Sequence, residues 1–167
     1  MSERTTKIGR AATADLSELL SLLDSVQLPR EGVAEHLSGF LVARDAVGRL
    51  VGCVGMERHG EVGLLRSAAV APDLQHTGLG SRLVAALLEQ ARAEGVGEMT
   101  LLTTTARDFF ARRFGFALGE RADYESRLSG SPEWRLPRCS SAAFMRLRLS
   151  ETRDDGVSRA ATHDDET

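Results

Sequence analysis

The sequence is poor in the residues that mark disulfide-bonded, fibrous or membrane-spanning proteins. Its 167 residues include two cysteines, four prolines and one tyrosine, and aromatic residues make up 5% of the chain. Two cysteines cannot build a disulfide framework, and no apolar run approaches the roughly 20 residues of a membrane span. Residues 1–7 lead into no apolar stretch that could serve as a signal peptide. We therefore expect a reduced, cytoplasmic protein.

Net charge is also small, and it is unevenly distributed. The formal net charge is −3, and residues 151–167 carry six acidic residues and two arginines, which leaves the rest of the chain near neutral. A neutral domain offers no clustered basic face for nucleic acid and no attraction to an anionic membrane. We predict one ordered domain over residues 1–150 and a disordered acidic tail over 151–167, since the tail has too little apolar surface to offset its ordering entropy.

Hydrophobic periodicity predicts a mixed α+β sheet. The predicted helices span residues 13–23, 30–36, 78–94 and 106–114, and the predicted strands span 40–43, 50–57, 62–70, 99–103 and 144–149, with a further extended segment after 116. Thr13 is the expected N-cap of the first helix, and Gly95 stands where a C-terminal cap belongs. Hairpin strands followed by a strand–helix–strand unit favour the α+β class.

The most informative segment is residues 70–81, Val-Ala-Pro-Asp-Leu-Gln-His-Thr-Gly-Leu-Gly-Ser, between a predicted strand and a long amphipathic helix. Gly78 and Gly80 allow a tight turn and a close ligand approach. Unpaired first-turn amides and the helix dipole suit a pyrophosphate there. A P-loop would need Lys after Gly80, and a Rossmann fingerprint would need glycine where Leu83 stands. A turn without a ligand is the alternative interpretation.

The spacing Gln75-x-x-Gly78-x-Gly80 resembles the acetyl-CoA motif of the GNAT N-acetyltransferases, with Val-Ala-Pro before it and Phe110…Gly115-Phe116 after it. The similarity extends to the N-acetyltransferases associated with arsenic-resistance operons. The similarity to this subgroup rests on segments 64–67, 101–106, 109–112 and 115–116 and on Cys139-x-Ser141-Ala142…Met145. The whole resemblance spans roughly residues 7–149. The implied architecture is the GNAT acyl-CoA N-acyltransferase fold, a central mixed, mostly antiparallel sheet flanked by helices.

This resemblance also implies a set of cofactor-binding residues. The backbone of Ala69 and Val70 would pair with pantetheine, one amide there would meet the oxyanion, and Phe110 would border the same channel. The amides that would wrap the pyrophosphate belong to Gln75, His76, Thr77, Gly78, Leu79, Gly80 and Ser81. The chain departs from relatives in three ways: His76 and Thr77 replace Gly and Arg, the segment 110–115 is one residue longer, and Phe110 lacks the hydroxyl of the tyrosine often found there.

Three residues are candidates for the chemistry. Glu57, at the end of a strand, would be the general base, and the alternative is an exposed strand-end acid. Arg66, inside an apolar strand, would bind an acidic group of the substrate, and the alternative is an internal ion pair. Tyr124, the single tyrosine, is the candidate proton donor.

Other side chains that often carry chemistry favour simpler roles. His59 is expected in a turn and Cys53 in the core, and Trp134 would either shape a substrate wall or pack. Cys139 lies in a polar loop where a soft ligand such as arsenic(III) is an alternative. The four histidines show no metal-ligand spacing, so we predict no metal site.

Together these features predict an acyltransferase that moves acetyl from acetyl-CoA to a primary amine by direct attack. The acceptor implied by the resemblance is a small amino-acid-like compound linked to arsenic resistance. Two rivals stay open: a protein or peptide N-acetyltransferase, and a non-catalytic acyl-CoA-binding or arsenic-sensing module. The expected partner is a small-molecule amine, without nucleic acid or membrane, and a homodimer is left open.

Overall fold

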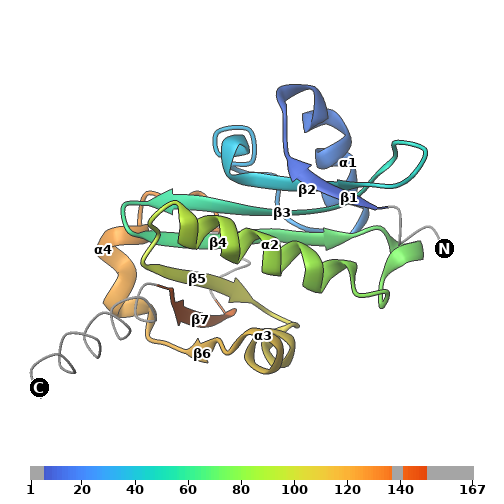
Figure 1. Ribbon diagram of the computed structural model, residues 1–167. Coiled ribbons are helices and arrows are strands. Elements are labelled where there is room, and N and C mark those ends of the chain that lie inside the picture. The colour runs from blue at the N-terminus through green and yellow to red at the C-terminus, as the bar shows by residue number, and fades with distance from the viewer. Residues whose placement is uncertain (1–5, 137–140, 150–167) are drawn as a thin grey trace, which may run out of the picture.

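The computed structural model describes residues 6–136 and 141–149, and a single sheet organises them (Figure 1). Within these residues the sheet has seven strands in the order β1-β2-β3-β4-β5-β7-β6. The strands are β1 (Lys7–Arg10), β2 (Phe40–Arg44), β3 (Leu50–His59), β4 (Val62–Val70), β5 (Glu98–Thr103), β6 (Ala117–Leu118) and β7 (Ala143–Arg148). Neighbouring strands are antiparallel except β4 and β5, which are parallel. The predicted α+β class and mostly antiparallel sheet are confirmed.

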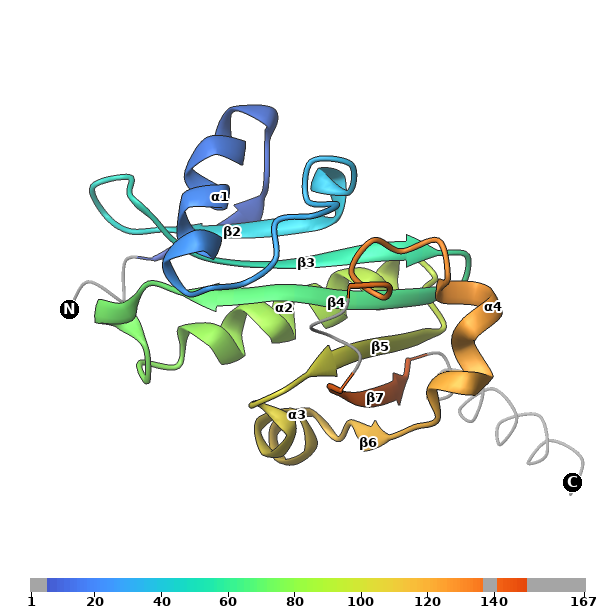
Figure 2. The same cartoon turned by 180° about the vertical axis from the view of Figure 1, so that it is seen from behind.

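Helices cover both faces of the sheet. The α-helices are α1 (Leu16–Ser25), α2 (Leu79–Ala93), α3 (Arg107–Phe114) and α4 (Glu125–Leu128), and short 3-10 turns lie at Thr13–Asp15, Leu37–Gly39, Pro72–Leu74 and Arg121–Tyr124. The helix α2 crosses the face seen in Figure 1, and α1 covers the face seen in Figure 2. The predicted apolar stripe of α2 is buried, and Gly95 at φ +88° ends that helix as expected.

Two expectations near the N-terminus are wrong. Thr13 does not cap the first helix, because a 3-10 turn precedes it and the carboxylate of Asp15 accepts a hydrogen bond from the Ala12 amide at 2.7 Å. The helix predicted over 30–36 is absent, and turns take its place. Gly32 has φ +84°, a left-handed conformation that a right-handed helix does not include. The strand β1 and the helix α4 were not predicted, because each is too short to show a period.

The strands β4 and β5 pair over only part of their length. Val62–Leu65 is in register with Glu98–Leu101, and beyond that point the two strands separate. A β-bulge on β4 begins where they part: Cys53 pairs with Ala69 and Gly55 pairs with Arg66, so Val54 opposes two residues of β4. Ser67, in the bulge, has φ +60°. The bulge bends β4 away from β5. As a result, residues 66–70 of β4 have no partner strand on the side that faces β5 among the described residues.

A second, smaller apolar cluster fixes the segment after β6 to the sheet. It consists of Val62, Leu64, Tyr124, Leu128, Trp134 and Phe144. Trp134 meets Phe144 edge-to-face with ring centroids 5.5 Å apart. This packing holds the loop that carries residues 129–136 against the start of β4, so a segment distant in sequence borders the gap between β4 and β5.

No helix among residues 6–136 and 141–149 is long and apolar enough to cross a membrane. The predicted tail, 151–167, and Cys139 lie outside the described residues.

Candidate active site

A cavity of about 490 Å³ opens where β4 and β5 separate. This volume lies within the range of small-molecule sites. Most of its wall comes from residues 65–70 of β4 and from residues 101–106, which form the end of β5 and the loop that follows it. The helices α2 and α3 add Gly80, Leu83, Val84, Phe109 and Phe110. The remaining wall residues are Gln27, Leu28, Pro29, Cys53, Glu133 and Ala142. The walls are mainly apolar, so the few polar groups in them can determine which ligand is held.

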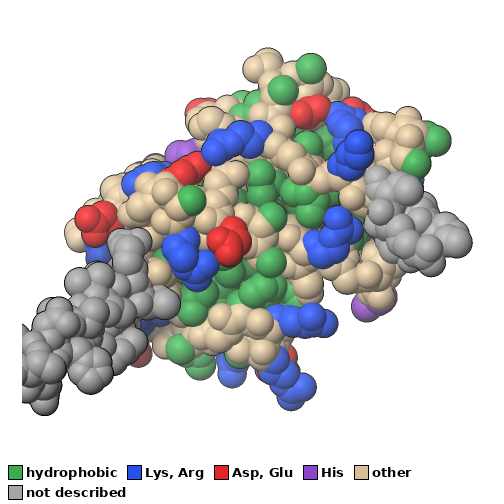
Figure 3. Space-filling model, in the orientation of Figure 1, with side chains coloured by type: hydrophobic (Ala, Val, Ile, Leu, Met, Phe, Trp, Pro, Cys, Tyr) green, Lys and Arg blue, Asp and Glu red, His purple; other side chains and the backbone are tan. Residues whose placement is uncertain are grey.

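The charged side chains on one face of the molecule lie in separate groups. On the face shown in Figure 3, apolar side chains gather over the middle of the molecule, and Lys and Arg side chains stand around them in separate groups, interspersed with Asp and Glu. This face carries no continuous basic patch. An anionic ligand would therefore be held by local donors.

The glycine-rich turn supplies such donors at one end of the cavity. His76 and Gly78 have positive φ, +69° and +92°, and α2 starts at Leu79. The first intrahelical bond runs from the Arg82 amide to the Gly78 carbonyl, 3.1 Å. The amides at the start of the helix therefore have no intrahelical acceptor, and the dipole of a 15-residue helix adds positive potential.

Two side chains of the turn, those of Gln75 and Thr77, hold its shape. The hydroxyl of Thr77 donates to the carbonyl of Leu74 at 2.6 Å, and the Gln75 side-chain amide donates to the carbonyl of Val70 at 3.1 Å. The turn is thereby tied to the end of β4. This tie keeps the helix N-terminus beside the free edge of Ala69 and Val70.

Gly80 lines the cavity, although the fold does not require glycine there. Its backbone is helical, and a Cβ would meet only Val70 Cγ2, at 3.7 Å, which is an ordinary contact. The absent side chain instead leaves the helix amides open from the cavity.

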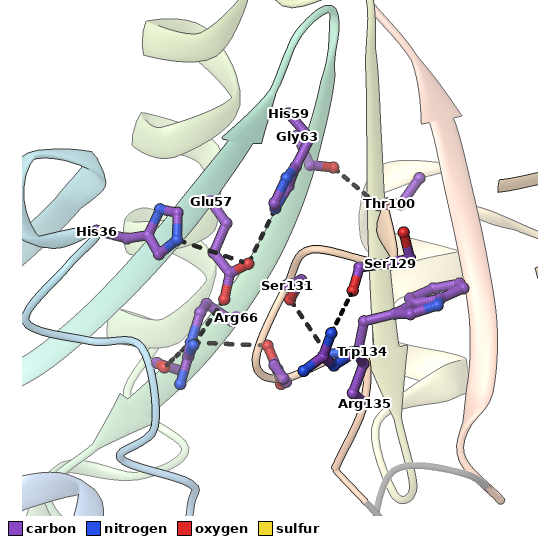
Figure 4. Close-up of polar contacts among 12 residues, drawn as sticks. His36, Glu57, His59, Gly63, Arg66, Thr100, Ser129, Ser131, Trp134 and Arg135 are labelled. Atoms are coloured by element: carbon purple, nitrogen blue, oxygen red, sulfur yellow. Dashed lines mark hydrogen bonds and ion pairs between the residues drawn. The ribbon is translucent and has the colours of Figure 1, made fainter. Parts of the chain in front are cut away.

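Glu57 and Arg66 form an ion pair inside the protein (Figure 4). The Arg66 Nη1 atom lies 2.7 Å from Glu57 Oε2, and both side chains are fully buried. His59 Nε2 lies 3.0 Å from Glu57 Oε1, and His36 lies at 3.9 Å. Burial alone would raise the pKa of Glu57, and hydrogen bonds with Ser131, His59 and Arg66 outweigh it and hold that pKa below its ordinary value.

Arg66 has further protein partners. Its Nε donates to Ser67 Oγ at 3.0 Å and its Nη2 to the carbonyl of Pro29 at 3.3 Å. The internal ion pair that the sequence left open is thus present. Arg66 also borders the cavity, and its contact with a substrate anion stays a prediction.

Glu133 is the polar wall residue that sequence reasoning missed. It is 7% exposed and lines the cavity, with its Oε1 atom 3.6 Å from Arg66 Nε. That buried oxygen has no hydrogen-bond partner among the described residues. Burial raises the pKa of Glu133 to about 7, with the Arg66 charge opposing and the Glu57 charge adding to the shift. The surrounding Ser-Pro-Glu-Trp sequence has no periodicity that would have pointed to a cavity.

The structure does not bring Tyr124 to the cavity. Its hydroxyl donates to Glu98 Oε2 at 2.7 Å, and its ring packs on Phe144. Burial and the Glu98 carboxylate raise the pKa of this phenol. That Tyr124 donates the proton to the leaving thiolate stays a prediction.

Phe110 does line the cavity, in edge contact with Phe109 and Phe116. At the end of α3 the Phe116 amide bonds the Phe110 carbonyl, six residues back. This closure is one residue wider than a Schellman motif, in keeping with the extra residue expected in this segment.

Cys53 and the histidines show no separate reactive site. Cys53 is buried and donates to the Ser67 carbonyl at 3.2 Å, and burial raises the pKa of its thiol to about 12. Over residues 6–136 and 141–149 there is no group of three His, Cys, Asp or Glu side chains that could hold a metal ion.

A parallel strand pair that separates at a bulge, beside a helix N-terminus whose first amides have no intrahelical acceptor, is an arrangement suited to an extended anionic ligand. The sequence matches the acetyltransferase (GNAT) family over residues 12–116. This chain belongs to that family, and the family predicted from the glycine-rich turn is confirmed. The narrower resemblance to the arsenic-associated subgroup stays a prediction.

Among curated proteins, the chain is 28% identical over 120 residues to the amino-acid acetyltransferase of Neisseria meningitidis serogroup A / serotype 4A. The match covers 66% of this chain and 27% of that protein, so the chain spans about a quarter of its length.

Two solved structures are also similar. N-acetylglutamate synthase from Neisseria gonorrhoeae, complexed with coenzyme A and N-acetyl-glutamate, matches with a TM-score of 0.72 and 25% identity over 86% of this chain and 35% of that one. Rv2747 from Mycobacterium tuberculosis, in complex with CoA and NLQ, matches with a TM-score of 0.70 and 26% identity over 86% of this chain and 99% of that one.

Proposed function

We propose that this protein is an acetyl-CoA-dependent N-acetyltransferase that acetylates a small primary amine of the amino-acid class by direct transfer. The observation that carries the proposal is the continuity of one cavity from the helix amides at Gly80 to the free edge of β4. A coenzyme with a pyrophosphate at one end and a thioester at the other requires both features in that order. The coenzyme A in the similar synthase structure supports the same assignment.

The chain supplies two binding surfaces for acetyl-CoA. The amides of residues 75–81 would bind the pyrophosphate, and the backbone of Ala69 and Val70 would pair with pantetheine like an added strand. The thioester would then lie near the bulge, where a backbone amide stabilises the oxyanion. Positioning the amine beside the thioester contributes much of the rate, of the order of 7–11 kcal/mol in favourable intramolecular reactions.

The acceptor class rests on the relatives and on the cavity. The similar proteins are an amino-acid acetyltransferase and a synthase holding N-acetyl-glutamate. The cavity holds one cationic and one carboxylate side chain among its described wall residues, Arg66 and Glu133. This pair is complementary to an acceptor that carries both an amine and an anionic group. The resemblance to the arsenic-associated subgroup adds amino acids that contain arsenic to the proposed acceptors.

Release of free CoA from acetyl-CoA tests the proposal. The acceptor panel contains amino acids, an organoarsenical amino acid, polyamines and short peptides. We expect turnover with at least one amino-acid-type acceptor and little with polyamines. Turnover with peptides alone would replace the proposal by a peptide N-acetyltransferase, and tight acetyl-CoA binding without CoA release would indicate a non-catalytic acyl-CoA-binding module.

A further inference from the structure

We propose that Glu133, and not Glu57, accepts the proton of the acceptor amine, and this inference rests on the proposed function. Glu133 lies outside the segments that the family match covers, since that match ends at residue 116. The inference therefore concerns a residue that the family assignment leaves without a role.

The two carboxylates differ in their access to the cavity. Among the described residues that line the cavity, Glu133 is the one Asp or Glu side chain. The other wall groups that carry ionisable protons are Arg66, which is cationic, and Cys53, whose thiol donates to a backbone carbonyl. Glu57 does not line the cavity, and its exposure is zero. A base must reach the proton that it removes, within about 2.6–3.2 Å or through one water.

The two carboxylates also differ in whether their oxygens have hydrogen-bond partners. Glu57 is occupied on both oxygens, Oε2 by Arg66 and Oε1 by His59. Glu133 Oε1 is buried and has no hydrogen-bond partner within the described part of the chain. Buried carboxylate oxygens are normally hydrogen-bonded, so an orphaned one in a cavity wall indicates a ligand that donates. A primary ammonium group carries three donors and fits that requirement.

Burial makes Glu133 the more basic of the two groups, because desolvation is the main cause that raises its pKa. Glu57 and Arg66 compensate each other at 2.7 Å, and Arg66 reaches Glu133 only at 3.6 Å. The facing charged groups are Arg66 from β4 and Glu57 from β3, and they act in opposite directions on Glu133. Its pKa of about 7 leaves it about half ionised at neutral pH, which suits a general base, whereas the pKa of Glu57 is held low.

The transfer step balances with this single base. The acceptor enters as an ammonium ion and gives one proton to the Glu133 carboxylate. The neutral amine then attacks the thioester carbonyl, the N–C bond forms and the C–S bond breaks. The second proton lost from the nitrogen goes to the CoA thiolate, so CoA leaves as a thiol and Glu133 returns its proton to solvent.

The test compares Glu133→Gln with Glu57→Gln, using the best acceptor of the panel. We expect Glu133→Gln to lower kcat by 10²–10⁴-fold and to abolish the rise of the rate through about pH 7, with unchanged acetyl-CoA affinity. Glu133→Asp, which keeps the carboxylate, should restore part of the rate and the pH dependence. Glu57→Gln should keep the pH dependence, and the unfolding transition of each variant reports whether it is folded.

Five outcomes decide the matter. Loss of the pH dependence in folded Glu133→Gln supports the inference. A raised KM with unchanged kcat would show that Glu133 only binds the ammonium, and an unaltered profile would show that it does neither; both overturn the inference and leave the proposed function standing. A wild-type protein that releases no CoA with any amine overturns the proposed function and the inference together. If Glu133→Gln does not fold, the wild-type and Glu133→Asp profiles decide, because a wild-type rate without an ionisation near pH 7 also overturns the inference.

Discussion

The guanidinium of Arg66 and the carboxylate of Glu57 lie 2.7 Å apart with neither side chain exposed to solvent. The two residues come from adjacent antiparallel strands, β4 and β3, where Arg66 is in register with Gly55 and Glu57 with Leu64, so they lie diagonally across the hairpin. Arg66 borders the cavity on the side of Glu133, and Glu57 lies behind it. The guanidinium of Arg66 therefore stands next to the carboxylate of Glu133, whose buried Oε1 has no hydrogen-bond partner among the described residues.

Removing one member of this pair should destabilise the protein. Arg66→Ala leaves the Glu57 charge buried and uncompensated, which costs about 3–5 kcal/mol, whereas the double variant Glu57→Gln/Arg66→Met should recover most of that loss. Urea unfolding in a double-mutant cycle measures the coupling. If Arg66→Ala keeps its stability and loses kcat/KM only for anionic acceptors, with neutral acceptors spared, Arg66 binds the substrate as the sequence suggested.

Substitution of Gly80 should separate stability from cofactor binding. Gly80→Ala places a Cβ at an ordinary distance from Val70, so we expect a gain of about 0.5–1 kcal/mol in helix stability and weaker acetyl-CoA binding. Gly80→Val should abolish binding, since its branched side chain would occupy the space that the phosphate needs. Calorimetric titration checks both variants.

Gly9→Val is the matched control for this pair. Gly9 lies in β1, where a Cβ would meet nothing within 4 Å and φ is not positive. We expect this variant to bind acetyl-CoA as the wild type does. A folded Gly80→Val protein with unchanged affinity would refute the proposed phosphate site.

Glu133 should make stability fall as the pH rises from about 4.5 to 7. Its pKa is raised to about 7 from 4.5, so the folded protein binds more protons than the unfolded chain in this window. The stability due to Glu133 is full below the unfolded pKa and is lost as the pH passes the folded one, a change of the order of 3 kcal/mol. Chemical denaturation at several pH values should show this slope in wild type and not in Glu133→Gln. Equal slopes in the two proteins would contradict the raised pKa.

Glu57 has the opposite effect on the pH dependence of stability, because the protein loses the contribution of its ionised form as the pH falls. Its lowered pKa means that the contribution of its ionised form is present above the unfolded pKa and is lost as the pH falls through the folded one. The Glu133→Gln protein should therefore still unfold in acid. Acid titration followed by tryptophan fluorescence reports this, and a variant that stays folded throughout the acid titration would argue against the Glu57 pair as the cause of acid unfolding.

Tyr124→Phe should affect stability more than catalysis. The phenol donates to Glu98 and lies outside the cavity wall, so its loss should cost about 1.5–3 kcal/mol, as for other hydrogen bonds to charged groups. The expected kcat is that of the wild type. A drop in kcat of tenfold or more in a folded Tyr124→Phe protein would instead support Tyr124 as the proton donor.

The sequence alone determined the features that depend on neighbouring residues. The turn at Gly78, the start of α2 and the buried stripe of that helix follow from short-range backbone preferences and a regular period, and all are present. The proposed phosphate site was accessible to sequence reasoning for the same reason, since the amides assigned to it lie within seven consecutive residues, 75–81. Elements of four residues, such as β1 and α4, were not predicted because they are too short for a period to appear.

Only the tertiary structure decided which carboxylate faces the cavity. Glu57 and Glu133 are both acidic residues in unremarkable local sequences, and nothing nearby in the chain distinguishes a paired, enclosed carboxylate from an orphaned one. The difference arises because the apolar cluster around Trp134 carries Glu133 to the gap between β4 and β5, where Arg66 is already bound to Glu57. Burial and partner charge set the pKa of a carboxylate, and both are properties of groups brought together from distant parts of the chain.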